Sequence, residues 1–273
     1  MNVGGHMNNN YEEYLDFAKE IAYDAGKIMK KYFSEDNGAN YKYDQTIVTK
    51  ADIEINHILI EKVKEKYPTH SVDGEEEQFG QSEYVWVCDP VDGTAMYARH
   101  IPVAVFSLAL VVDGNPKVGV VYDVFTDNLY TAIIGQGAYR NGHKISVNNI
   151  QLDDMRSVSN FDMWPEAEYN IYDSIKELGM KTYFVGIGTV IHACMCVANG
   201  DFNLAVFPGT KHKNCDIAAA KVIVEEAGGK VTDLFGNEQR YDEDINGAII
   251  SNTVVHDEVV NVIKKNTRNL KKL

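Results

Sequence analysis

One stretch constrains the fold most: an apolar run at 85–88 that leads into Asp-Pro-Val-Asp-Gly-Thr at 89–94. Four consecutive apolar residues indicate a buried strand. Pro90 has no backbone N–H and favours an extended conformation in the residue before it. Gly93 permits a sharp bend, after which its own N–H and that of Thr94 can face an anion. Two carboxylates beside an anion site predict Mg²⁺ together with phosphate at the end of this strand.

The same stretch also has an ordinary interpretation. Asp-Pro-x-Asp-Gly sequences are common in turns, because each of these residue types favours turn geometry. A single motif therefore carries a real risk of a false match. Other parts of the chain have to decide between a simple turn and a functional site.

Composition limits the classes of function. The chain has 273 residues, of which 45% are hydrophobic, enough for a sizeable core in one large domain or two closely packed ones. The net charge of −14 argues against a nucleic-acid or anionic-membrane binder. It does not argue against an anionic substrate, because bound metal ions can reverse the local charge.

The same composition argues against export and membrane insertion. No apolar run is long enough for a transmembrane helix, and the amino terminus is polar, with no secretory signal. The four cysteines are too few and too scattered for a disulfide scaffold, and a zinc site is not expected. We therefore expect a cytoplasmic protein with reduced thiols.

Hydrophobic periodicity predicts helices first and antiparallel strands next. Apolar residues recur at helical spacing over 11–33, and a second helix should follow residue 52 and end near 67. Three β-type runs at 103–112, 116–125 and 129–134 are separated by short Asp- and Asn-containing turns. This spacing predicts an antiparallel meander.

The carboxy-terminal half alternates strand and helix patterns, which predicts an α/β layer. A glycine-rich connector at 135–142 favours a domain boundary near Ser146, between an α+β region at 8–145 and an α/β region at 146–273. Short strands are expected at 157–160, 182–185, 202–207 and 248–251, and helices at 188–199, 216–227 and 254–264.

Several motifs in a fixed order make the chain resemble the inositol monophosphatase family, within the wider lithium-sensitive, magnesium-dependent phosphatases. The order and combination are specific and cover nearly the whole chain from about residue 11. The motifs are Ile-Val-Thr-Lys-Ala-Asp at 47–52, Gly-Glu-Glu at 74–76, Trp-Val-Cys-Asp-Pro-Val-Asp-Gly-Thr at 86–94, Gly-Ala-Tyr-Arg-Asn-Gly at 137–142, Gly-Thr at 188–189, Asp-Ile-Ala-Ala-Ala at 216–220 and Glu-Ala-Gly-Gly at 226–229. The resemblance implies an α+β fold, a layered αβαβα sandwich with the site between its two regions, and commonly a homodimer.

The resemblance also implies two or three Mg²⁺ ions per site. One would be held by Glu75, Asp89 and the carbonyl of Val91, a second by Asp89, Asp92 and Asp216, and a weaker third near Glu75. Phosphoryl transfer needs charge neutralisation more than covalent chemistry, which such a cluster provides. Without cations, the four carboxylates should repel one another strongly.

Further roles follow from the same resemblance. Asp52, Thr94 and Glu75 form the catalytic set, in which Asp52 accepts a proton from a metal-activated water through Thr94. The N–H groups of Gly93 and Thr94 would hold the phosphate, with Gly188 and Thr189 as further substrate contacts. Without the resemblance, Asp52 is better interpreted as a helix N-cap.

The chain departs from the family pattern around the substrate. Met96, Cys215 and Ala220 stand where Asn, Trp and Gly are usual, and the strand at 203–207 lacks the acid that binds inositol hydroxyls in the family. Lys211 and Lys213 come just before Asp216 instead. They form either a solvated basic loop or a pair of contacts for a second anionic group on the substrate.

The sequence therefore predicts a Mg²⁺-dependent phosphomonoesterase that acts on a small phosphorylated metabolite by in-line attack of water. One alternative is a bisphosphate-specific enzyme of the same superfamily, acting on a nucleotide 3′-phosphate or a fructose bisphosphate. Another is a non-catalytic metal- or phosphate-binding protein. The haloacid-dehalogenase phosphatases are rejected, because two residues instead of one separate Asp89 from Asp92.

Overall fold

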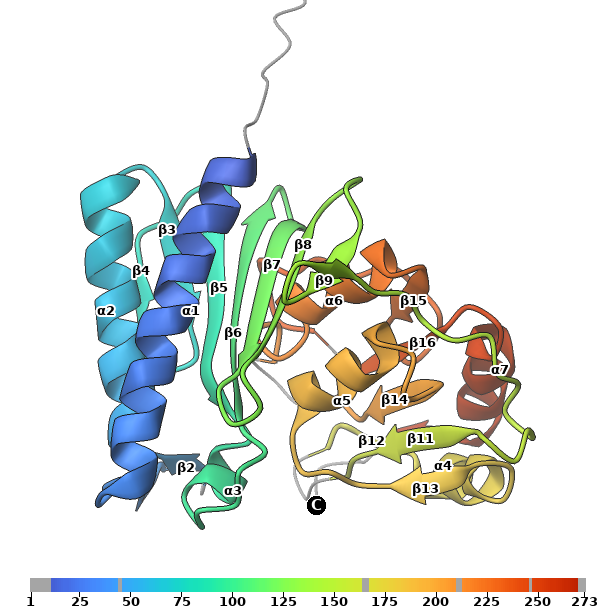
Figure 1. Cartoon of the computed structure of the whole chain (residues 1–273). Coiled ribbons are helices and arrows are strands. Elements are labelled where there is room, and N and C mark those ends of the chain that lie inside the picture. The colour runs from blue at the N-terminus through green and yellow to red at the C-terminus, as the bar shows by residue number, and fades with distance from the viewer. Residues whose placement is uncertain (1–10, 44–45, 164–166, 210–212, 246, 270–273) are drawn as a thin grey trace, which may run out of the picture.

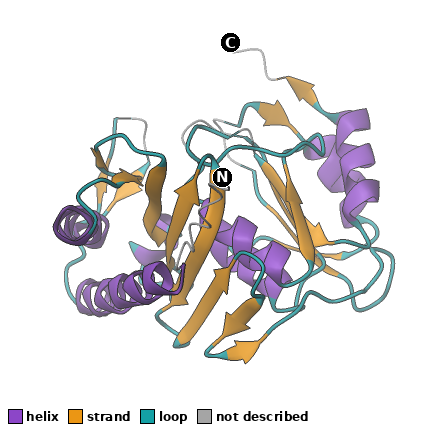
Figure 2. Ribbon diagram, turned by 90° about the horizontal axis from the view of Figure 1, so that it is seen from above, coloured by secondary structure: helices purple, strands orange, loops and turns teal. Residues whose placement is uncertain are grey.

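The elements lie in five layers, helix–sheet–helix–sheet–helix (Figure 1). The computed structural model describes residues 11–43, 46–163, 167–209, 213–245 and 247–269. Seen from above, the same layers follow one another across the molecule (Figure 2). The predicted αβαβα sandwich is therefore confirmed. Its outer helices are α1 (Tyr11–Ser34) and α2 (Lys50–Lys66) on one side and α4 (Tyr172–Gly179) and α7 (His256–Asn266) on the other, with α5 (Val190–Ala198) and α6 (Ala218–Glu226) between the sheets.

The first sheet has the strand order β10-β9-β8-β7-β6-β5-β3-β4. Among its described neighbours only β3 and β5 pair in parallel. The predicted meander is present, and its turn at Asp113–Gly114 uses positive φ at both residues (50° and 74°). The strands are β3 (Ser71–Gly74), β4 (Gln78–Phe79), β5 (Tyr84–Asp92), β6 (Val105–Val112), β7 (Asn115–Asp123), β8 (Asn128–Ile133), β9 (Ala138–Arg140) and β10 (His143–Lys144).

The second sheet has the order β13-β11-β14-β16-β15. Strand β11 pairs in parallel with both β13 and β14, whereas β16 pairs antiparallel with β14 and β15. Neither β15 nor α4 was predicted, because β15 is a four-residue strand with little apolar pattern and α4 is an eight-residue helix without a side-chain N-cap. The strands are β11 (Val158–Phe161), β13 (Tyr183–Val185), β14 (Leu204–Phe207), β15 (Gly229–Thr232) and β16 (Ala248–Asn252).

Short elements complete the fold. A one-turn helix α3 (Thr94–Tyr97) follows β5 directly. Two small ribbons pair β1 (Asn40–Tyr41) with β2 (Ile47–Val48), and β12 (Tyr169–Asn170) with β17 (Arg268–Asn269). The four cysteines are thiols with no disulfide between them. Within the described residues, no helix combines the length and the hydropathy needed to cross a bilayer.

Three apolar clusters fill the spaces between the layers. One packs α1 and α2 on the first sheet around Trp86, and another packs α4 and α7 on the second sheet around Ile249. The central cluster joins Val121 of the first sheet, Ile191 of α5 and Ile250 of the second sheet. The two predicted regions therefore share a core, and a division at 145/146 stays a prediction.

Candidate active site

The end of β5 carries Asp89 and Asp92 into the interior, where they are only 3% and 6% exposed. Between them the pairing with β6 slips: Asp89 lies opposite Ser107, and Asp92 lies opposite Val105. Three steps along β5 thus match two along β6, which is a β-bulge at Pro90. Asp89 Oδ1 accepts a hydrogen bond from Val91 N at 3.0 Å. The bulge therefore turns both carboxylates and the Val91 carbonyl into one small region.

Asp92 joins the first sheet to the start of α5. Its Oδ1 accepts from Val190 N at 3.2 Å, and its Oδ2 accepts from Ile191 N at 2.8 Å. A carboxylate stabilises a helix at this end by satisfying free N–H groups. Burial raises the pKa of Asp92, and hydrogen bonds from Thr189, Ile191 and Val190 oppose that rise. The predicted Thr189 is accordingly next to Asp92.

Gly93 lies against the same loop of the second region. Its φ is +85°, and a Cβ at this position would come within 2.9 Å of Thr189 Cγ2. Both the backbone conformation and the close approach require glycine. Gly188 has φ +79° and packs on Met96 of α3. The structure therefore brings Gly93, Gly188 and Thr189 together, as a phosphate site between α3 and α5 requires.

Asp52 lies in the first turn of α2 and is 1% exposed. Thr49 is the N-cap, and both its N–H (2.7 Å) and its hydroxyl (2.5 Å) donate to Asp52 Oδ2. The other oxygen, Oδ1, is buried with no hydrogen-bond partner. Burial raises the pKa of Asp52 to about 7, against the effect of the Thr49 hydrogen bonds. Asp52 is thus a capping-box residue that keeps one oxygen available.

Thr94 begins α3 and is directed to a different acceptor. Its hydroxyl donates to the carbonyl of Val91 at 2.8 Å. Asp52 and Thr94 therefore each have another partner in this arrangement, and no direct hydrogen bond joins them. The proposed proton path from Thr94 to Asp52 stays a prediction.

Asp216 and Glu75 reach the site from different elements, the start of α6 and the end of β3. Asp216 is 5% exposed and lies just before α6, which begins two residues later. Glu75 follows β3, and its N–H donates to the Cys88 carbonyl of β5 at 3.1 Å. Lys213 Nζ lies 3.6 Å from Glu75 Oε1 and 3.6 Å from Asp216 Oδ2. Lys213 therefore faces the predicted metal ligands, whereas Lys211 lies outside the described residues.

The electrostatics of the cluster suit a hard cation. Burial and then the charges of Glu75, Asp216 and Asp92 raise the pKa of Asp89 well above its ordinary value. Burial likewise raises the pKa of Asp216 to about 7, opposed by Lys213. These carboxylates raise one another's pKa, so a cation that binds them would relieve the repulsion. Together with Asp52 Oδ1, which has no hydrogen-bond partner, they supply the oxygen ligands that Mg²⁺ prefers.

The side chains still have to move to coordinate an ion. Among the residues that the structure describes, no three His, Cys, Asp or Glu side chains are placed so that they could hold one ion as they stand. A narrow cleft beside Asp216, also lined by Lys213 and Phe207, has a volume of only about 10 Å³. Coordination therefore requires local rearrangement of this cluster.

Asp162 is a candidate that the sequence interpretation missed. It follows β11, which pairs in parallel with β14. After β11 the chain continues to α4 on the outer face of the sheet, and after β14 it continues to α6 on the inner face. Ligands of open α/β sheets bind in the crevice at such a point. Asp162 Oδ2 accepts from Asn160 Nδ2 at 2.8 Å, and Asn160 Oδ1 accepts from Ile187 N at 3.0 Å. This chain of contacts connects Asp162 to the loop that carries Thr189.

A signal for Asp162 exists in the sequence. The strand predicted at 157–160 ends two residues before it, so the acid stands where the strand's carboxyl end meets solvent. Burial raises the pKa of Asp162 to about 6, opposed by the hydrogen bond from Asn160. What the sequence does not reveal is which strand lies beside β11.

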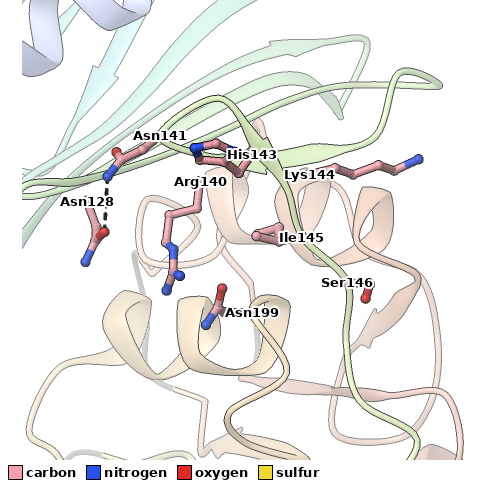
Figure 3. Close-up of a pocket in the computed structure, with 8 residues that line it drawn as sticks. All are labelled: Asn128, Arg140, Asn141, His143, Lys144, Ile145, Ser146 and Asn199. Atoms are coloured by element: carbon pink, nitrogen blue, oxygen red, sulfur yellow. Dashed lines mark hydrogen bonds between the residues drawn. The ribbon is translucent and has the colours of Figure 1, made fainter.

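A wider cavity lies elsewhere in the molecule. It has a volume of about 470 Å³ and is found between the β9–β10 hairpin and the end of α5, where Arg140 extends toward Asn199 (Figure 3). None of the predicted site residues lines it. The lining residues are Asn128, Arg140, Asn141, His143, Lys144, Ile145, Ser146 and Asn199.

Comparisons with known proteins agree on one family. The model described as the inositol monophosphatase family matches residues 10–268. Inositol monophosphatase 1 of Solanum lycopersicum is 30% identical over 242 residues, which cover 85% of this chain and 88% of the relative. A fructose-1,6-bisphosphatase/inositol-1-monophosphatase of Aquifex aeolicus is 32% identical over 274 residues, covering 94% and 97%. The solved structure of a Thermotoga maritima IMPase superposes with a TM-score of 0.82 at 27% identity, covering 93% and 97% of the two chains.

Proposed function

The chain belongs to the inositol monophosphatase family and is a phosphoric monoester hydrolase, and on that premise we propose that it is Mg²⁺-dependent and hydrolyses a small phosphorylated metabolite by in-line attack of water. The observation that carries this proposal is the buried acid cluster, in which Asp89, Asp92 and Asp216 are 3%, 6% and 5% exposed. Buried carboxylates are unfavourable unless cations compensate them. Mg²⁺, when bound, supplies charge neutralisation and activates water.

We assign the proposed metal ligands to two ions. Glu75, Asp89 and the Val91 carbonyl would hold one ion, and Asp89, Asp92 and Asp216 a second; two to three ions per site is our proposal. The Val91 carbonyl already accepts from Thr94, but a carbonyl oxygen has a second lone pair. Hydrogen bonds to α5 hold Asp92 in place while its remaining lone pairs stay available.

Other groups are proposed to accept the proton of the attacking water and to bind the phosphate of the substrate. Asp52 is the proposed proton acceptor, because its pKa is raised to about 7 and its Oδ1 has no partner. Thr94 would orient the attacking water, and the N–H groups of Gly93 and Thr94 would hold the phosphate next to Thr189. Lithium sensitivity, a homodimeric state and a cytoplasmic location remain proposals from the family resemblance.

Release of inorganic phosphate tests this function directly. The substrates are inositol 1-phosphate, a nucleotide 3′-phosphate, fructose 1,6-bisphosphate and p-nitrophenyl phosphate, each with Mg²⁺ or with EDTA. We expect Mg²⁺-dependent release from at least one of them. If none is cleaved while Mg²⁺ and inorganic phosphate still bind, the protein is the non-catalytic binder that the sequence left as an alternative.

For the substrate, we propose the monophosphate of a polyhydroxy compound, and not a bisphosphate. Lys213 contacts carboxylates and does not offer an open anion site, whereas Asp162 places a hydrogen-bond acceptor just after the carboxyl end of β11. A carboxylate that binds hydroxyl groups discriminates against esters lacking them. Asp162→Asn should lower kcat/KM for inositol 1-phosphate about tenfold, with little change for p-nitrophenyl phosphate. Equal losses on both esters would make Asp162 structural, and a wild-type preference for the bisphosphate would overturn the assignment.

A further inference from the structure

A cation belonging to the chain itself lies between two of the proposed metal ligands. The ammonium of Lys213 is 3.6 Å from Glu75 Oε1 and 3.6 Å from Asp216 Oδ2. Its side chain is 31% exposed, and the two carboxylate side chains are 19% and 7% exposed. These contacts are therefore shielded from water more than a surface ion pair, and their charges interact more strongly.

The contacts join the first sheet to the start of α6. Glu75 follows β3 and Asp216 precedes α6, so the lysine links two distant parts of the chain. Its neighbour Asn214 makes a contact of the same kind: Asn214 Nδ2 donates to Asp73 Oδ2 at 2.7 Å, across 141 residues. Asn214 also donates to the Tyr241 carbonyl at 3.1 Å. The segment that carries Lys213 is thus tied down next to the site, and its ammonium does not belong to a solvated loop.

A second lysine shares one of the same oxygens. Lys42 Nζ is 3.7 Å from Glu75 Oε1 and donates a hydrogen bond to Glu76. Lys42 contacts only the Glu75 and Glu76 side of the site, whereas Lys213 also reaches Asp216. Lys213 is therefore the ammonium group whose position overlaps with that of an ion held by both Glu75 and Asp216.

The Lys213 ammonium lies where an ion shared by Glu75 and Asp216 would have to bind, since it is 3.6 Å from an oxygen of each. A Mg²⁺ ion needs oxygen ligands at about 2.1 Å and keeps several waters. An ammonium group at contact distance from both carboxylates excludes that arrangement by volume and by charge.

We propose that Lys213 is a tethered competitor for the metal centre. In the metal-free protein its ammonium bridges Glu75 and Asp216, and a divalent ion that uses both carboxylates displaces it. The lysine thus stabilises the metal-free fold and weakens Mg²⁺ binding, which sets a threshold Mg²⁺ concentration for the site to fill. The inference rests on the proposed metal ligands, but it concerns metal affinity and stability, not turnover.

Lys213→Met tests the competition, because methionine keeps the unbranched apolar stem of the side chain and removes the ammonium group. Calorimetric titration of metal-free protein with Mg²⁺ should show a Kd lower by about tenfold, which corresponds to about 1.4 kcal/mol. The Tm of the metal-free variant should fall, and the rise in Tm on adding Mg²⁺ should be larger than in the wild type. Lys213→Arg, which keeps the charge, should stay near the wild type. An unchanged or higher Kd in Lys213→Met would overturn the proposal.

Lys230→Met is the matched control, because Lys230 pairs with Asp257 on the surface at 3.4 Å, away from the site residues. It should change neither the Mg²⁺ affinity nor the metal-free Tm. If Lys213→Met does not fold without metal, the wild type gives the answer by acetylation with an N-hydroxysuccinimide ester and mass spectrometry. Lys213 should react faster after Mg²⁺ is added, while Lys230 should not; an unchanged Lys213 rate would refute displacement.

The two proposals fail in different ways. Mg²⁺-dependent phosphate release together with unchanged affinity in Lys213→Met would refute the competition and leave the proposed function in place. Tighter Mg²⁺ binding in the variant without any phosphate release would refute the proposed function alone.

Discussion

Two charge clusters within this fold are built in opposite ways. Lys221 of α6, 10% exposed in its side chain, donates to Glu225 at 2.6 Å, Glu238 at 2.6 Å and the Val231 carbonyl at 3.0 Å. Lys213 approaches Glu75 and Asp216 only to 3.6 Å, and no hydrogen bond joins them. In the first cluster, each N–H of the ammonium donates to an acceptor. In the second cluster, the ammonium and the carboxylates are close but make no hydrogen bond to one another.

The difference separates a structural tie from a binding site. A fully satisfied buried network fixes one geometry, because every alternative loses hydrogen bonds. A cluster of acids that raise one another's pKa stores unfavourable energy that an incoming cation releases. Variants in the two clusters should therefore fail differently, in stability for the first and in metal-linked activity for the second.

The largest expected effect comes from Asp92→Asn, which removes a ligand charge at nearly constant volume. Loss of leaving-group stabilisation should lower kcat/KM by about a thousandfold or more at saturating Mg²⁺. The fold should persist, with a lower Tm because the amide has only one oxygen for the Val190 and Ile191 N–H groups. Steady-state kinetics, with the exposed Asp153→Asn as control, measures this. A rate near that of the wild type would remove Asp92 from the metal site.

Thr94→Ala should reduce kcat by about a hundredfold and leave KM nearly unchanged. The hydroxyl is proposed to act on the water, whereas backbone N–H groups hold the phosphate. Thr94→Ser retains the hydroxyl and should recover most of the rate. If KM rises and kcat holds, Thr94 is only a binding residue.

Lys221→Met should show the opposite behaviour and cost about 2 kcal/mol of unfolding free energy, because Glu225 and the Val231 carbonyl lose their donor. Denaturant unfolding at fixed pH measures the loss. The Mg²⁺ affinity should not change, in contrast to Lys213→Met. A shift in Mg²⁺ affinity as large as that of Lys213→Met would mean that the two clusters are coupled through α6.

The last prediction concerns how the stability of the metal-free protein changes with pH. The folded pKa of Asp52 is raised from 3.8 to about 7, so the folded state binds more protons than the unfolded state between these values. Its contribution to stability is therefore present at low pH and is lost as pH rises through about 7, by on the order of 1 kcal/mol per pH unit. Unfolding of metal-free wild type and Asp52→Asn from pH 4 to 8 should show a shallower slope in the variant. Parallel curves would show that Asp52 is not protonated in the fold.

The local elements followed from local patterns. The α1 and α2 helices have apolar stripes at helical spacing, and the β6–β8 meander has connections of two and four residues between its strands. The end of β5 was also visible, since Pro90 and Gly93 restrict the backbone wherever they stand. In contrast, β15 has little pattern of its own and α4 is short and uncapped, and both form because neighbouring strands and helices cover them.

Asp52 illustrates a partial success. The sequence left it between a helix cap and a catalytic base, and the structure gives one of its oxygens to the cap through Thr49 while the other stays without a partner. The N-cap itself is Thr49, not Asp52, because the helix begins at Lys50, three residues earlier than a cap at Asp52 would place it. Boundaries of this kind depend on cap geometry, which residue types alone do not decide.

The sequence by itself determined the family, the layered fold that the family implies, and the acids at the end of β5 and before α6. These follow from short motifs whose backbone requirements are local. Only the tertiary structure decided that Asp92 caps α5 across 99 residues, that Asp162 stands beside β14, and that Lys213 bridges Glu75 and Asp216. Such contacts join segments with no shared pattern, and they exist because two sheets pack on the same pair of helices and bring their strand ends together.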